Sequence, residues 1–172
     1  MSDGALEPPR RLRRDDDRDD FESGASELDD WYRRFAWENQ QANNAVTYVT
    51  TWQGATMGYY AIAMAGYATT DLPEGLRKNR PSQTPCLLLA RLAVDLRAQK
   101  KGIGAALLRD ALERSFALSE SVGAAALLIH CRDDRARDFY LANGDFIASP
   151  LEPMHLVLPM KEIRRRLRNP VP

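Results

Sequence analysis

The sequence has no apolar run approaching the ~20 residues that a membrane-spanning helix needs. Its charged N-terminus carries no apolar signal-peptide core. Its two cysteines lie far apart and form no disulfide framework. Net charge is absent as well, because 24 basic residues balance 24 acidic ones. These absences argue against a membrane protein, favour a reducing cytoplasm, and mean that a nucleic-acid partner must be argued from local charge.

Patterns typical of metal sites or of a covalent nucleophile are also missing. The two cysteines and two histidines match no zinc-ligand spacing, and adjacent His130 and Cys131 would point to opposite faces of a strand. No cysteine or serine has an identifiable base and orienting partner. We therefore expect no metal and favour direct transfer over a covalent intermediate.

The chain of 172 residues, 44% apolar and 28% charged, is long enough for one domain with a core. Residues 1–20 mix prolines with runs of both charges and hold hardly an apolar side chain, so we expect them to be disordered. We predict one folded domain over residues 21–160. Residues 161–172 form a short basic helix or tail.

Apolar residues at helical spacing predict a first helix that begins near Ser26, with Asp29 three residues later, and runs to about Gln41. Two β-rich runs follow, at residues 46–52 and 57–65, and Gln53-Gly54 supplies turn chemistry for a hairpin. Residues 66–85 read as a long connection, a kind that is usually functional or mobile.

The second half alternates strands and helices. Residues 86–94 read as a central strand broken by Arg91, which either reaches an active-site cleft or pairs with a carboxylate. A long amphipathic helix begins at Ile103 and ends at Gly123, and a strand over 124–131 completes a parallel crossover unit. Asp133 or Asp134 caps the next helix, which ends at Asn143-Gly144, before final strands at 146–148 and 154–160.

The stretch Gln99-Lys100-Lys101-Gly102-Ile103-Gly104, between the central strand and the long helix, reads as a phosphate cradle. Its glycines let a ligand approach the backbone, and the helix N-terminus presents unpaired N–H groups and a positive dipole end. The stretch is neither a Walker loop nor a dinucleotide fingerprint. An ordinary strand-to-helix turn is the alternative interpretation.

With its upstream strand, this stretch resembles the acetyl-CoA pyrophosphate loop of the GNAT N-acetyltransferase superfamily, in which Gln99, Gly102 and Gly104 fill the motif positions. Asp133, Ala136, Phe139, Tyr140 and Gly144 resemble the last conserved helix of that superfamily. The resemblance covers about residues 19 to 160. Further segments resemble the GNAT toxins of bacterial toxin–antitoxin pairs: Leu28-Asp29-Asp30-Trp31, Asn39-Gln40, Gly58-Tyr59-Tyr60, Leu89 to Asp95 and Ser149 to Met154.

The resemblance implies a mixed α/β fold of the GNAT acyl-CoA N-acyltransferase type. Its central sheet is mostly antiparallel, contains one splayed parallel strand pair and is flanked by helices. The implied function is a toxin that transfers an acetyl group from acetyl-CoA to the α-amino group of aminoacyl-tRNA, which arrests translation. Its implied partner is a ribbon–helix–helix antitoxin, and we also expect a homodimer. The alternatives are an acetyltransferase of a protein N-terminus or small amine, and a non-catalytic coenzyme- or RNA-binding module.

The resemblance also implies site residues. Tyr140 would protonate the departing thiolate, a task that suits a hydroxyl with a reference pKa of about 10. The alternative is that Tyr140 anchors the core. The residues implied for acetyl-CoA are Leu92, Ala93, Val94, Gln99, Lys100, Lys101, Gly102, Ile103, Gly104, Ala105, Asp133, Ala136 and Phe139.

The sequence departs from the superfamily pattern in two places. Asp145 separates Gly144 from Phe146, so the following strand carries an extra residue or a bulge. Asp133 stands where many relatives have Asn, which weakens its expected coenzyme contact but not its capping role.

No strong general base is evident in the sequence, which favours an α-amine acceptor with a pKa near 7.7–8.0 over a lysine near 10.4. Basic residues that could contact tRNA phosphates are Arg33, Arg34, Arg77, Lys78, Arg80, Arg91 and Arg164 to Arg166.

Overall fold

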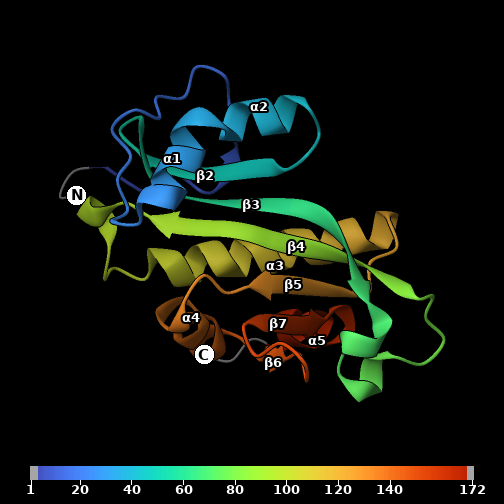
Figure 1. Cartoon of the computed structure of the whole chain (residues 1–172). Coiled ribbons are helices and arrows are strands. Elements are labelled where there is room, and N and C mark those ends of the chain that lie inside the picture. The colour runs from blue at the N-terminus through green and yellow to red at the C-terminus, as the bar shows by residue number, and fades with distance from the viewer. Residues whose placement is uncertain (1–3, 170–172) are drawn as a thin grey trace. The chain divides into compact units, whose positions relative to one another are not determined.

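The computed structural model describes residues 4–169 and divides into two compact parts (Figure 1). Of the described residues, the first part comprises 4–63 and 90–110, and the second comprises 64–89 and 111–169. Two strands and one helix each contribute residues to both parts: β3 (Ala55–Ala68), β4 (Gln83–Val94) and α3 (Ile103–Ser121).

The hairpin predicted in the first part is present. Strands β2 (Val46–Trp52) and β3 (Ala55–Ala68) pair antiparallel. The turn places Gln53 and Gly54 at positive φ (49° and 80°), as the tightest hairpin turns require. A register shift between Thr50 and Thr51 marks an irregularity in the pairing.

The first predicted helix is two helices, α1 (Ser26–Arg34) and α2 (Ala36–Gln41), which are separated at Phe35. The helix begins at Ser26, as predicted, but Ser26 and Asp29 do not cap it, because the N-cap is Ala25 and makes no side-chain hydrogen bond. The buried Asp29 carboxylate instead accepts hydrogen bonds from the backbone N–H and the hydroxyl of Ser23. It therefore fixes the chain that enters the helix.

The prediction that residues 1–20 are disordered was wrong for the described residues 4–20. Strand β1 (Arg10–Arg11) pairs antiparallel with β2, and the neighbouring Leu12 is buried in the core. The side chain of Gln40 donates to the Leu12 carbonyl (2.9 Å) and accepts from the Thr47 N–H (3.0 Å). One buried leucine and pairing to an existing strand edge are enough to order a charged segment, because the partner already presents the apolar surface.

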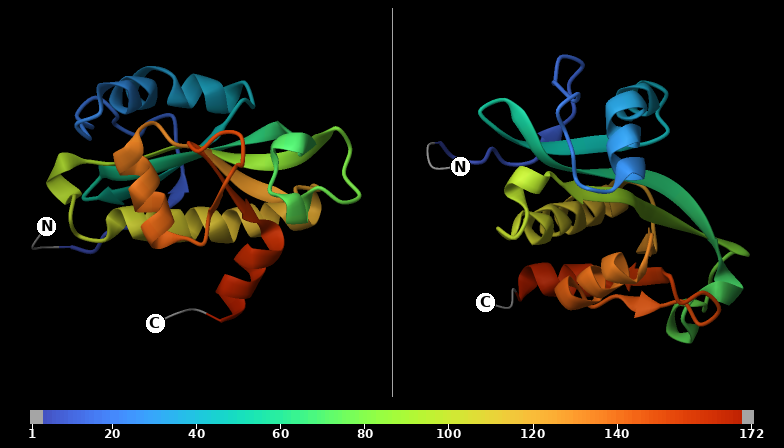
Figure 2. Two further views of the ribbon diagram at one scale, coloured as in Figure 1. Left: turned by 60° about the horizontal axis from the view of Figure 1, so that its bottom comes forward. Right: turned by 60° about the vertical axis from the view of Figure 1, so that its left-hand side comes forward.

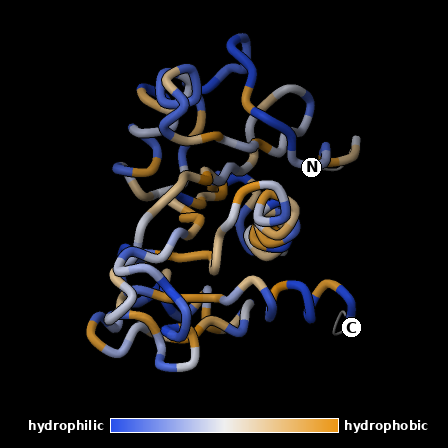
Figure 3. The backbone as a smooth tube through the Cα atoms, turned by 90° about the vertical axis from the view of Figure 1, so that its right-hand side faces the viewer, coloured by the Kyte–Doolittle hydropathy of each residue, from blue (hydrophilic) through white to orange (hydrophobic). Residues whose placement is uncertain are grey.

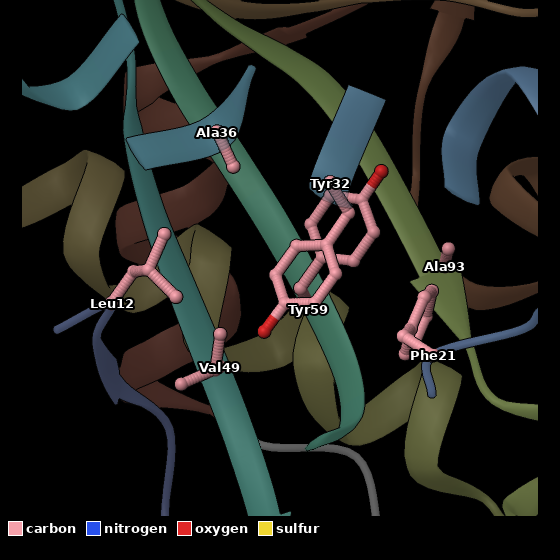
Figure 4. Packing of buried hydrophobic residues seen from close by; sticks show 7 residues of the cluster. All are labelled: Leu12, Phe21, Tyr32, Ala36, Val49, Tyr59 and Ala93. Carbon is pink, nitrogen blue, oxygen red and sulfur yellow. The ribbon is translucent and has the colours of Figure 1, made fainter. Parts of the chain in front are cut away.

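Seven residues, shown in Figure 4, form the core cluster of the first part. Tyr32 and Tyr59 stack at 4.6 Å, and Phe21 meets both rings edge-on. Adjacent residues of β3 serve opposite faces of the sheet. Tyr59 donates to the Leu28 carbonyl of α1, whereas Tyr60 donates to Asp110 of α3. Accordingly α1 and α2 lie on one face of β2 and β3, and the first turns of α3 lie on the other (Figure 2).

The second part contains the predicted crossover. Strand β4 (Gln83–Val94) pairs in parallel with β5 (Ala126–His130), and α3 (Ile103–Ser121) connects them. Strand β5 pairs antiparallel with β7 (His155–Pro159), which pairs with the short β6 (Ile147–Ala148). The chain continues into α5 (Met160–Arg168), along which hydrophobic and hydrophilic residues alternate (Figure 3).

The long connection expected over residues 66–85 is shorter in the structure. Strand β3 extends to Ala68, β4 begins at Gln83, and two 3₁₀ turns (Thr69–Asp71 and Glu74–Leu76) lie in the interval. Buried Leu72 and Leu76 attach this segment to the core of the second part.

The strand order of the sheet is β1-β2-β3-β4-β5-β7-β6. The mixed, mostly antiparallel sheet with one parallel pair and flanking helices confirms the predicted fold class. Within residues 4–169, no helix is long and apolar enough to cross a membrane.

Candidate active site

The loop that leads into α3 belongs to the first part of the chain. Lys100 and Gly102 have positive φ values (62° and 80°), and α3 begins one residue later, at Ile103. Lys100, Lys101 and Gly102 are exposed, and the first turn of α3 contains no acidic residue. An exposed, basic helix N-terminus without a competing carboxylate fits a phosphate-bearing ligand.

Gly102 is required by the geometry of this loop. Its φ of 80° is a conformation that L side chains rarely adopt, and no atom lies within 4 Å of the position that a Cβ would occupy. The backbone can therefore meet a ligand without a side chain between them. Of the residues next along the helix, Ile103 is buried, Gly104 is half-buried and Ala105 is exposed.

Gln99 holds the loop through its side chain. Its Nε2 donates to the Val94 carbonyl (2.9 Å) and to the Ser23 carbonyl (2.8 Å). In the described structure the Gln99 amide thus ties the loop to the end of β4 and to the segment before α1. Of the other β4 residues predicted to contact coenzyme, Leu92 and Val94 are half-buried and Ala93 is buried.

Asp95 is a second anchor of the same loop. Its buried carboxylate accepts from the Glu22 N–H (3.0 Å), the Arg97 N–H (2.9 Å) and the Arg97 guanidinium (2.8 and 3.0 Å). Burial raises the pKa of a carboxyl, but here the hydrogen bonds from Arg97 and Glu22 prevail and lower the pKa of Asp95.

Arg91 lies over the ring of Trp31, with its Cζ 4.6 Å from the ring centroid. Trp31 in turn lies parallel to Tyr59 at 6.1 Å. Within the described residues, no carboxylate pairs with Arg91, and its buried Nε has no hydrogen-bond partner. The interpretation of Arg91 as half of a strand ion pair was therefore wrong, and a cation with unused donors remains.

Tyr140 lies in the second part, on α4 (Asp134–Asn143), and is buried. Phe139 and Phe146 meet its ring edge-on at 5.2 and 6.2 Å. Its hydroxyl makes no hydrogen bond with any residue that the structure describes. Burial, and secondarily the charge that a Cys131 thiolate would carry, raises the pKa of Tyr140. The ring is anchored in the core, and the hydroxyl remains a protonated donor.

The start of α4 is as predicted. Asp133 is the N-cap and accepts from the Ala136 N–H at 2.8 Å, and it also pairs with Arg132 at 3.0 Å. Ala136 and Phe139 are half-buried.

The extra residue after Gly144 lies in the connection before β6. A Cβ on Gly144 would come within 2.5 Å of the Phe146 ring, so the buried Phe146 folds back against the end of α4. Asp145 is exposed and pairs with Arg166 of α5 at 3.2 Å. The departure from the superfamily pattern thus places an ion pair on the surface and leaves β6 two residues long.

The candidate RNA-binding residues differ in exposure. Arg34, Arg77, Lys78 and Arg80 are exposed, and the Nε atoms of Arg77 and Arg80 donate to the Leu72 and Leu76 carbonyls. Arg33 is half-buried and donates to the Phe21 carbonyl. The guanidinium groups of Arg77 and Arg80 thus each donate one N–H to the backbone and keep their other N–H groups for a ligand.

Burial raises the pKa of Cys86 to about 11 and also raises the pKa of Cys131. Both thiols are therefore protonated at neutral pH, which fits direct transfer better than a cysteine nucleophile. Among residues 4–169 the structure groups no three side chains suited to hold a metal ion. It does bring together His130 and His155 as a stacked pair, which the spacing of the two residues in the sequence does not indicate. No local pattern could reveal this pair, because strand register creates it.

Comparison with known proteins gives consistent results. The model of the acetyltransferase (GNAT) family matches residues 11–144. The chain is 42% identical over 156 residues to the "tRNA-acetylating toxin" of Mycobacterium tuberculosis (strain ATCC 25618 / H37Rv), covering 91% of this chain and 93% of that protein.

Two solved structures are similar in fold. One is AtaT complexed with acetyl-methionyl-tRNAfMet, with a TM-score of 0.85, 24% identity and coverage of 95% of this chain and 99% of that one. The other is a mutant AtaT toxin bound to the C-terminus of the antitoxin AtaR and acetyl-CoA, with a TM-score of 0.79, 21% identity and coverage of 96% and 98%.

Proposed function

Because the chain belongs to the acetyltransferase (GNAT) family, we propose that it is a toxin that transfers the acetyl group of acetyl-CoA to the α-amino group of aminoacyl-tRNA. The acceptor is supported by the identity of 42% to a tRNA-acetylating toxin over nearly the whole chain. Acetylation removes the nucleophile that peptide-bond formation requires, so translation would stop.

The buried, protonated hydroxyl of Tyr140 is the observation that best supports acetyl transfer as the activity. Direct transfer needs a proton donor for the departing thiolate, and burial keeps this hydroxyl protonated. A thiolate whose conjugate acid has a pKa of about 8.5 is basic enough to draw that proton as the bond to carbon breaks. The hydroxyl makes no hydrogen bond with any described residue, so it is available to a substrate atom.

We assign acetyl-CoA to the residues implied by the superfamily motif. The loop from Gln99 to Gly104 would hold the pyrophosphate with backbone N–H groups, and Lys100 and Lys101 would add charge. Ala105 opens the exposed side of the same helix turn. Leu92, Ala93 and Val94 would offer strand backbone to the pantetheine arm, and Asp133, Ala136 and Phe139 would flank Tyr140.

The acceptor RNA would meet a cation held on an aromatic ring. Recognition of single-stranded RNA ends relies on stacking against aromatic rings and guanidinium planes. Arg91 over Trp31 offers both, with donors that no described residue uses. Arg33, Arg34 and the loop cations Arg77, Lys78 and Arg80 would contact phosphates farther along the tRNA.

The remaining proposals rest on the resemblance to GNAT toxins. They are a ribbon–helix–helix antitoxin as the neutralising partner, a homodimer as the assembly, catalysis without a metal, and a cytoplasmic location, where charged tRNA is found. A mutant AtaT in complex with the C-terminus of AtaR supports the antitoxin.

The test is acetylation of total charged tRNA with labelled acetyl-CoA, beside the same tRNA after deacylation. We expect label in acid-precipitable RNA from the charged sample alone, recovered as N-acetyl-aminoacyl product after hydrolysis. Turnover of acetyl-CoA that tRNA does not affect, together with labelling of peptides or small amines, would assign the protein to the other acceptor class. If acetyl-CoA is not turned over with any acceptor, the protein is a non-catalytic binding module.

A further inference from the structure

The two histidines of the chain form a stacked pair. His130 is the last residue of β5, and antiparallel register places it directly opposite His155, the first residue of β7. Their rings lie 3.9 Å apart at an interplanar angle of 20°. Residues 25 positions apart in sequence thus share one surface at the end of two strands.

Tyr67 of β3 holds one member of this pair. Its hydroxyl forms a hydrogen bond with Nδ1 of His155 at 3.1 Å, and its ring lies 5.9 Å from the His155 ring and 6.5 Å from the His130 ring. His155 is half-buried, whereas His130 is exposed and makes no hydrogen bond with a described residue. The His155 imidazole is therefore fixed by a hydrogen bond. The His130 imidazole stacks on it, and its nitrogens make no hydrogen bond with a described residue.

The surroundings of His130 favour its neutral form. Removal of the ring from water lowers the pKa of His130, and positive charge on His155 lowers it further. Glu152, in the segment before β7, acts in the opposite direction and is outweighed. Tyr67 is the titratable group that β3 contributes. An imidazole with a pKa below 6.5 is unprotonated at pH 7 and can accept a proton.

His130 ends β5, and the chain then continues into the helix that carries Tyr140. Successive residues of an extended chain point to opposite faces, and Cys131 follows His130 directly. His130 faces Tyr67 and His155. The Cys131 side chain is therefore directed away from them, and α4, which carries Tyr140, begins three residues later. The proton acceptor thus lies at the end of the strand from which the chain leads directly into the helix that carries the proton donor. Acyl transfer needs one group that accepts a proton from the amine nitrogen and one that donates a proton to sulfur.

We propose that His130 is the general base of the reaction, that it takes the first proton from the α-ammonium group of the acceptor, and that His155 and Tyr67 position it. The inference rests on the proposed function. The ammonium loses one proton to the free imidazole nitrogen of His130, and the neutral amine then forms the C–N bond. As the C–S bond breaks, Tyr140 gives its proton to sulfur and regains one from the nitrogen. His130 releases its proton to water, so one proton is produced per acetyl group transferred.

The first experiment is a pH profile of single-turnover acetylation with His130→Gln, which keeps a polar side chain but cannot act as a base. We expect wild-type rates to fall only below about pH 6.5, whereas the variant is about 10²-fold slower at pH 6.5. The defect should shrink to a few-fold at pH 9, because the α-amine, with a pKa near 7.7–8.0, is then already neutral. Loss of the same factor at every pH would show a structural role and overturn the proposal.

The second experiment measures the pKa of the His130 imidazole directly and does not depend on enzyme activity. With only two histidines in the chain, proton NMR of the full-length protein gives two sets of ring signals, which His155→Phe assigns. We expect a His130 pKa below 6.5 that rises in His155→Phe, because the repelling charge is gone, with the acidic limb of the rate profile moving to higher pH by the same amount. A His130 pKa above 7 in the wild type would overturn the proposal.

The two levels of inference fail separately. If wild-type protein does not acetylate charged tRNA, the proposed function is wrong. If it does, and His130→Gln shows the wild-type pH profile, only the role of His130 is wrong.

Discussion

Tyr140 combines a fixed ring with a hydroxyl that makes no hydrogen bond with the described protein, so its two roles can be separated. We expect Tyr140→Phe to lower kcat and kcat/KM together by about 10²–10⁴, since the lost interaction exists only in the transition state. Affinities for acetyl-CoA and tRNA should not change. The melting temperature is the control and should also be unchanged, because no protein hydrogen bond is removed. Wild-type acetylation by this variant would assign the proton to water and leave Tyr140 as a core residue.

Two substitutions of Gly102 that differ in charge but hardly in shape test whether the helix N-terminus binds a phosphate. Asn and Asp have nearly equal size, and both tolerate positive φ better than other side chains do. Gly102→Asn should weaken acetyl-CoA binding modestly through bulk, and Gly102→Asp should abolish it, because a carboxylate would meet the pyrophosphate. Calorimetry with acetyl-CoA measures both. Equal affinities of the two variants would show that no phosphate lies at this position.

The buried carboxylate of Asp95 should make the stability of the protein sensitive to acid. Its pKa is lowered in the folded chain from the ordinary 3.8, so its stabilising effect is present above pH 4 and is lost as pH falls through the folded value. Asp95→Asn should lower the free energy of unfolding by about 1–3 kcal/mol at pH 7, and the difference from wild type should shrink by pH 3. Urea denaturation at both pH values measures this. Arg97→Ala should cost less, because the Arg97 side chain is 50% exposed. A difference that does not depend on pH would contradict the role of the ionised carboxylate.

At the scale of elements, local sequence chemistry was a good guide. The Gln53-Gly54 turn, the start of α3 at Ile103 and the Asp133 cap were all predicted, because each depends on residues within one turn of chain. The break at Phe35 was not predicted, since apolar spacing continues through it. The end of β3 was placed too early as well, because Tyr67 is buried by distant residues of the second core cluster.

The segment from Thr69 to Ser82 carries three cations that we expect to contribute to RNA binding. Neutralising Arg77, Lys78 and Arg80 to Gln should raise KM for aminoacyl-tRNA and reduce the salt slope by about 0.9 per lost phosphate contact, with KM for acetyl-CoA unchanged. A second triple variant, of the exposed α5 arginines Arg164, Arg165 and Arg168, tests the other candidate path for the tRNA. Melting temperatures of both variants exclude unfolding. If the slope changes only in the α5 variant, the tRNA path follows that helix instead.

At the scale of the whole chain, the features that sequence could not predict are those made by long-range pairing. His130 and His155 meet through strand register, and Arg91 meets Trp31 through packing of α1 on β4. The ordering of residues 4–20 has the same origin, because their own composition cannot sustain a fold. The function, by contrast, was predicted from short motifs, because coenzyme loops and caps are local structures.

The N-terminal segment gives the prediction at this scale. Residues 21–172 alone would expose the surface that Leu12 covers and would leave the buried Gln40 amide without its Leu12 acceptor. We expect this truncation to lower the free energy of unfolding by at least about 3 kcal/mol, from lost apolar burial and from the lost hydrogen bonds between β1 and β2. Leu12→Ala in the full chain should account for about 2 kcal/mol or more.

Charge in this segment should matter much less than the leucine. Arg13→Ala with Arg14→Ala keeps the backbone pairing, and both side chains are exposed, so their loss should change stability by no more than about 0.5 kcal/mol. Urea midpoints of the truncated, Leu12→Ala and double-arginine variants separate burial from charge. If the truncated chain unfolds at the same urea concentration as the full chain, β1 contributes nothing, and the boundary at residue 21 drawn from composition is the correct one.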